Sequence, residues 1–208
     1  MAHLASFFVP IFKDFIMNDF FLAENRTYSI ELDEDSSVEL RQFIVGEIDK
    51  IEVFAYPIRK ALKKDWVTED LHTVVDNNQI AATMLLESLS NLTFEAASKI
   101  KDAAPDKFIE IFEMLLIVNK TYFEQDEVKK NNKSDDKFSW FDSFQTLISK
   151  GHRHKDILSY SFGAFMEYLK AAQRNECNSL LNYGATMRFA YHADNKGYAK
   201  YTNAINKD

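Results

Sequence analysis

Two histidines spaced as His152-x-His154 are the first residues in this sequence whose types and spacing suggest chemistry. In a helix, positions i and i+2 lie about 200° apart, so the two imidazoles could not share a metal ion there. On a loop they could chelate a metal if carboxylates joined them, but no other histidine or cysteine lies nearby in the sequence. We therefore interpret the pair as part of a solvated basic loop, and we expect neither a metal site nor a cofactor.

Nucleophilic and acid–base chemistry finds no better support. Carboxylate pairs such as Glu110/Glu113 and Asp135/Asp136 lie in no catalytic motif, and the single cysteine, Cys177, has no histidine at an informative spacing. The sequence contains no P-loop, dinucleotide-binding, nucleophile-elbow or zinc-protease motif. With five glycines in 208 residues, the chain has too few glycines for a glycine-rich phosphate-binding loop. We predict that the protein is not an enzyme.

Net charge and hydropathy limit the classes of partner that the chain could bind. The net charge of −7 argues against a protein that neutralises nucleic-acid phosphate, and no apolar stretch reaches the 18 or so residues of a membrane span. We therefore expect protein partners, with a homo-oligomer left open, and neither a nucleic acid nor a membrane. A lone cysteine fits a reducing cytoplasm. One acidic segment, which runs from Glu24 to Glu39, is either a solvated surface or a contact for a basic partner.

Scarcity of turn residues predicts the fold class. The chain has 5 glycines and 3 prolines, whereas sandwiches, barrels and propellers need turn residues every 8–12 positions or so. We therefore predict a mainly α, multi-helix protein. Apolar spacing and capping residues predict helices over Pro57–Lys64, 68–75, 78–89, 93–103, 105–122, 139–150 and 161–189, and from Asn195 onward. Within the helix over 161–189, a break at Asn175–Ser179 stays open.

A small β element is expected near residues 27–56. Residues 27–32 alternate polar and apolar side chains, as a half-buried strand does, and residues 50–56 could pair with them. Between the two, the pattern Ser36-x-x-Glu39 is typical of a capping box and predicts a helix over about 37–48.

The composition of residues 124–137 predicts a boundary between two regions of the chain. They are highly charged and contain one apolar residue, as a flexible linker or loop does. We expect an acidic, mostly helical region over residues 1–123, the linker over 124–137, and a helical region over 138–208.

Phenylalanines cluster at the N-terminus. Six of the 18 lie in the first 21 residues, and large apolar side chains recur at helical spacing over residues 4–16. This face is either the buried side of a core helix or a surface for another chain. In the second case, changing Phe7 and Phe12 to Ser would weaken partner binding more than folding. The candidate partner-binding residues are Phe7, Phe8, Ile11, Phe12, Phe15, Trp140 and Phe141.

Short motifs in the C-terminal third resemble a known family. They are Phe138-Ser-Trp-Phe-Asp142, Leu147-Ile-Ser-Lys-Gly151, Asp156-Ile-Leu-Ser-Tyr160, Phe165-Met-Glu-Tyr168 and Ala171-Ala-Gln-Arg174. This layout, mainly within residues 138–205, resembles the C-terminal part of tail assembly chaperones and related small tail proteins of long-tailed bacteriophages. Residues 1–104 show no such match.

The resemblance implies a non-enzymatic role in virion assembly. Such chaperones coat the long, apolar tape-measure protein until the tail tube polymerises around it, which implies a location in the host cytoplasm. Two alternatives stay open. One is a structural virion component, such as a tail, neck or baseplate subunit. The other is an acidic inhibitor of a host protein.

Overall fold

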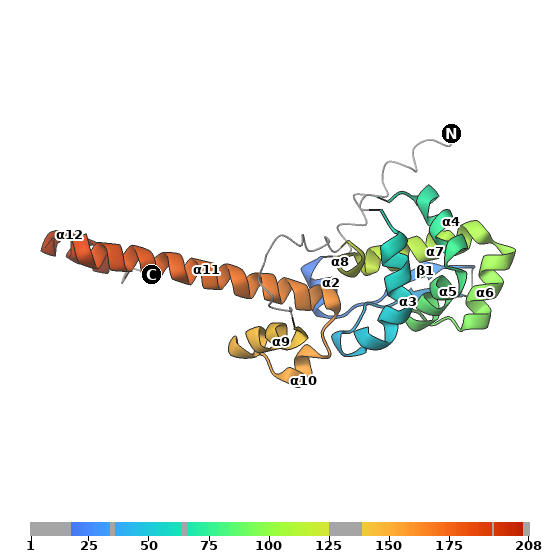
Figure 1. Cartoon of the computed structure of the whole chain (residues 1–208), viewed down its shortest axis with the longest axis horizontal. Helices are drawn as coiled ribbons and strands as arrows, with labels where there is room; N and C mark the ends of the chain where they lie inside the picture. Colours follow the sequence, from blue (N-terminus) through green and yellow to red (C-terminus); the bar gives the residue numbers. More distant parts are fainter. Residues whose placement is uncertain (1–17, 34–35, 64–65, 125–138, 193, 206–208) are drawn as a thin grey trace. The chain divides into compact units, whose positions relative to one another are not determined.

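The computed structural model describes residues 18–33, 36–63, 66–124, 139–192 and 194–205. The mainly α prediction is confirmed, and a two-stranded antiparallel sheet accompanies the helices. In order, the helices and strands are α2 (Asp19–Ala23), β1 (Tyr28–Glu31), β2 (Ser37–Leu40), the 3-10 helix η1 (Val45–Glu47), α3 (Ile48–Ala61), α4 (Thr68–Asn77), α5 (Gln79–Ser88), α6 (Phe94–Ala103), α7 (Pro105–Val118), α8 (Lys120–Phe123), α9 (Trp140–Ser149), α10 (His154–Ile157), α11 (Phe162–His192) and α12 (Asn195–Ile205) (Figure 1).

The chain divides into two compact units, Met1–Glu167 and Tyr168–Asp208, and the division falls within α11. We call them the N-terminal unit and the C-terminal unit and describe each by itself. Most of the linker expected over residues 124–137 lies outside the described residues, as do residues 1–17.

Helix α7 is the centre of the N-terminal unit. It contacts α4, α5, α6, α8 and β2 (Figure 1). Pro105 occupies the first turn, as predicted, because its missing N–H has no intrahelical partner there. One long face of α7 is fully buried, and it consists of Phe108, Ile111, Phe112 and Leu115. The helix ends at Val118, before the predicted end at residue 122, because Asn119 interrupts it and α8 follows.

The strand at residues 27–32 is confirmed, but its expected partner at residues 50–56 is wrong. Strand β1 pairs with β2, with Ile30 opposite Val38. The helix predicted from the capping-box pattern Ser36-x-x-Glu39 is also wrong, because Ser37–Leu40 form β2. Val38 and Leu40 are both fully buried at a spacing of two, so burial favours a strand over the helix that local capping favours.

Residues 50–56 belong instead to α3, which also contains Pro57. The prediction that Pro57 begins a helix is therefore wrong. A proline inside a helix removes one backbone hydrogen bond. Burial of a continuous apolar face outweighs this loss, since α3 packs against α5 through residues spaced three or four apart, Ile48, Ile51, Ala55 and Ile58.

Candidate protein-interaction surfaces

Exposed large apolar side chains occur on several helices of the described part of the chain, and the two largest sets lie on α9 and α11. Of the predicted partner-binding residues, Trp140 and Phe141 begin α9. The other five, Phe7, Phe8, Ile11, Phe12 and Phe15, lie outside the described residues.

Ser139 and Asp142 fix the start of α9. The Ser139 hydroxyl accepts a hydrogen bond from the backbone N–H of Phe141 at 3.2 Å, and the Asp142 carboxylate accepts one from the N–H of Ser139 at 3.2 Å. This capping box satisfies N–H groups that the first turn would otherwise leave unpaired. It also holds Trp140 and Phe141 in the first turn, about 100° apart around the helix axis.

Trp140 forms one wall of an aromatic cluster. Its ring centroid lies 5.8 Å from that of Phe165 and 6.4 Å from that of Phe162. The ring of Phe162 in turn lies edge-on to Tyr122 at 5.7 Å. The indole therefore packs within the N-terminal unit on one side, and 42% of the residue stays exposed.

Phe141 has the opposite environment. It is 75% exposed, and its aromatic contact is with Phe144, at 6.1 Å in the same helix. Ile148 follows on the same face and is also exposed. We call Phe141, Phe144 and Ile148 the α9 stripe. Of the two predicted residues on α9, Phe141 is the more exposed.

The histidine pair lies beside this region. The Nδ1 atom of His152 is 2.9 Å from the hydroxyl of Tyr160, and the His154 ring packs edge-on against Phe144 at 5.6 Å. Each imidazole thus contacts a different aromatic residue. Within the described residues, no three His, Cys, Asp or Glu side chains form a group that could hold a metal ion.

In the C-terminal unit, every residue of α11 from Gln173 to His192 is exposed. Several of these side chains are large and apolar, including Leu180, Met187 and Tyr191, which are 64%, 72% and 86% exposed. A helix in water draws most of its stability from burying an apolar face. Residues 173–192 bury almost none.

Helix α12 contacts the other side of α11. The Tyr201 ring stacks on Phe189 with centroids 4.7 Å apart, and its hydroxyl lies 2.8 Å from that of Thr186. Asp194 starts α12, since its carboxylate accepts a hydrogen bond from the N–H of Gly197 at 2.7 Å. Phe189 is nine residues from Leu180, so the two lie about 180° apart around the helix axis.

The face of α11 opposite Phe189 is therefore open. It carries a row of residues three or four positions apart, which we call the α11 stripe: Leu180, Tyr183, Gly184, Met187 and Tyr191. A methyl group added at Gly184 would meet nothing within 4 Å, so this row has a shallow point at its middle.

The sequence predicts the helix over 161–189 but does not single out the α11 stripe as a binding surface. One signal could have found it. Residues 173–179 include no large apolar side chain, so the helix enters this segment without a face for a core. The apolar residues that follow include Leu180, Leu181, Met187 and Phe189, which point to more than one side of the helix.

The chain matches no protein-family model, and no curated protein and no solved structure matches it significantly. Among the described helices, none is both long enough and apolar enough to cross a membrane.

Proposed function

We propose that this chain is a non-enzymatic assembly protein that binds an apolar helical client during assembly of a bacteriophage tail. The observation that carries the proposal is the helical segment 173–192, which displays large apolar side chains and is exposed at every residue. Contiguous exposed apolar surface is typical of protein-binding sites.

The binding mode would be helix against helix. The α11 stripe offers anchors spaced three or four residues apart, which is the spacing at which an amphipathic helix packs its apolar face against another. A client helix lying along Leu180, Met187 and Tyr191 would cover side chains that are now in water. The favourable free energy of that burial would stabilise both the client and α11.

The proposal that the client is a bacteriophage tail protein rests on the sequence resemblance. The motifs Phe138–Asp142, Asp156–Tyr160 and Phe165–Tyr168 resemble those of small tail proteins and tail assembly chaperones. The net charge of −7 suits such a role, since it opposes self-aggregation of a protein that displays apolar surface.

Mass spectrometry and affinity purification test the proposal together. A tagged full-length chain should co-purify with the tape-measure protein from cells in which the encoding phage assembles tails. Finished particles should lack the chain. If the chain occurs in particles at fixed stoichiometry, it is a structural subunit. If it instead captures a host enzyme with salt-sensitive affinity, it is an inhibitor. Either result overturns the proposal.

Matched variants test whether the α11 stripe is the site that binds the client. The double variant Leu180→Ser/Met187→Ser should lose the client, whereas Asn178→Ser, an exposed polar change in the same helix, should keep it. Equal recovery of client by both variants would show that the α11 stripe is not the binding site.

A further inference from the structure

Charge is divided unequally between the two units. The N-terminal unit, residues 1–167, contains 29 acidic and 19 basic residues, a net charge of −10. The C-terminal unit, residues 168–208, contains 3 acidic and 6 basic residues, a net charge of +3. The unit that carries the α11 stripe is therefore basic, although the whole chain is acidic.

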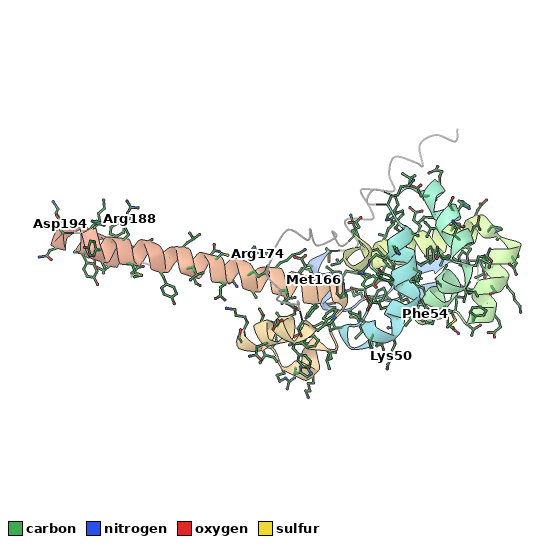
Figure 2. All side chains as sticks on the ribbon, in the orientation of Figure 1. Lys50, Phe54, Met166, Arg174, Arg188 and Asp194 are labelled. Atoms are coloured by element: carbon green, nitrogen blue, oxygen red, sulfur yellow. The ribbon has the colours of Figure 1, made fainter. Side chains whose placement is uncertain are left out.

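Two arginines accompany the α11 stripe along one edge. Arg174 and Arg188 are 14 residues apart in α11, which brings them to nearly the same side of the helix (Figure 2). Both are exposed, and no ion pair joins either of them to another residue of the described chain. Leu181, exposed and apolar, lies between them on this edge.

The opposite edge is different. Tyr183 and Ala190 lie there with one acid, Glu176. A helix packed along Leu180, Met187 and Tyr191 would therefore face two arginines on one of its flanks and little charge on the other. Opposite charges at the rim of an apolar contact select the partner, while the apolar centre supplies most of the affinity.

We propose that the α11 stripe binds an amphipathic helix of another protein whose flank is acidic, with carboxylates pairing to Arg174 and Arg188. This inference rests on the proposed function for the use of the α11 stripe as the client site, and it adds the chemistry of the client. A second copy of α11 is a poor occupant, because an antiparallel copy would bring the same basic edge toward the first and a parallel copy would offer only one acid, Glu176, for the two arginines.

Two synthetic peptides test the charge requirement. Both carry the same Leu/Met stripe on a stable helix, one with glutamates and the other with lysines on its flanks. Each is labelled and titrated with the full-length chain, and fluorescence anisotropy reports binding. In about 50 mM salt, we expect the glutamate peptide to bind about three- to tenfold more tightly, the effect of two exposed ion pairs. The difference should shrink in about 500 mM salt.

Charge reversal supplies the matched control. The variant Arg174→Glu/Arg188→Glu should invert the preference in favour of the lysine peptide. The variant Lys60→Glu/Lys99→Glu makes the same change in net charge at exposed sites of the N-terminal unit, and it should keep the wild-type preference. Circular dichroism of each variant checks that helix content is unchanged.

Other outcomes overturn the inference in distinguishable ways. Equal affinity for both peptides would refute the inference that the client is acidic, but it would leave the apolar docking of the proposed function intact. Analytical ultracentrifugation could show a dimer that Leu180→Ser/Met187→Ser converts to monomer, with no binding of either peptide; the occupant would then be a second copy. If the tape-measure protein does not co-purify with the chain but the peptide selectivity is retained, only the proposed function is contradicted.

Discussion

The side chain of Asn119 accepts a hydrogen bond from the backbone N–H of Phe43 at 2.6 Å, across 76 residues of sequence. Its amide nitrogen donates to the carbonyl oxygens of Arg41 and Leu115 at 3.2 and 3.1 Å. Asn119 is buried, and it lies at the break between α7 and α8. One amide therefore joins the central helix of the N-terminal unit to the extended segment that follows β2.

Asn119→Ala should destabilise the N-terminal unit by about 1–3 kcal/mol, because it leaves buried backbone groups without hydrogen-bond partners. Chemical denaturation monitored by circular dichroism measures the loss. Asn91 is the matched control, since its amide also bridges two backbone groups, the N–H of Glu39 and the carbonyl of Ser37, but it is exposed. Water can replace those bonds, so Asn91→Ala should cost less. Equal costs would contradict a special role for Asn119.

Tyr122 should make stability fall at high pH. Burial raises the pKa of its hydroxyl to about 12; the nearby Arg59 guanidinium opposes this shift and the Glu52 carboxylate adds to it. The unfolded chain ionises Tyr122 near its usual pKa of about 10. The stabilisation is therefore complete below about pH 10 and is lost as the pH rises through 12, with a total of about 2–3 kcal/mol.

Tyr122→Phe isolates this effect. The hydroxyl is buried and has no hydrogen-bond partner among the described residues, so its removal should leave stability at pH 7 unchanged or higher. Between pH 10 and 12, the variant should lose less stability than the wild type. Tyr183→Phe removes an exposed hydroxyl and should keep the wild-type profile. Identical profiles for all three proteins would show that Tyr122 does not carry the dependence.

Helix starts could be predicted from the sequence because their chemistry is local. The hydroxyl of Thr93 accepts from the N–H of Ala96, and that of Ser161 accepts from the N–H of Ala164, both at 3.2 Å. Gly151, with φ of 98°, ends the segment after α9, as predicted, because glycine adopts a positive φ without steric cost. Each signal lies within a few residues of the boundary that it sets.

Residues 36–61 could not be predicted in this way because their structure depends on distant partners. Ser36 and Glu39 have the local pattern of a helix start, but the N–H of Glu39 donates to the side chain of Asn91, 52 residues away. The same limit applies to the α11 stripe. Its helical spacing is visible in the sequence, whereas its exposure depends on which elements leave it uncovered.

Two glycine substitutions should have effects of opposite sign. The N–H of Gly46 donates to the carbonyl oxygen of Leu158 at 2.9 Å, and an added Cβ would lie only 3.0 Å from that same oxygen. Gly46→Ala should therefore cost about 1–3 kcal/mol, since backbone must shift to make room. At Gly184 the methyl group meets open space, so Gly184→Ala should stabilise α11 by about 0.5–1 kcal/mol.

Hydrogen exchange can assign each glycine effect to its unit. Gly46→Ala should lower the protection of amides near Leu158, and Gly184→Ala should raise the protection of amides around residue 184. Destabilisation by Gly184→Ala would show that the α11 stripe is covered in solution at that point.

Phe141 and Phe165 should separate binding from folding in the N-terminal unit. Phe165 is 1% exposed and contacts Trp140, so Phe165→Ala should cost about 3–5 kcal/mol, as loss of a buried aromatic side chain does. Phe141→Ser removes a side chain that is mostly in water and should change the free energy of unfolding by no more than about 0.5 kcal/mol. If the α9 stripe contacts the client, Phe141→Ser should still reduce client recovery in the affinity purification. A destabilisation by Phe141→Ser comparable to that by Phe165→Ala would instead place Phe141 in the core.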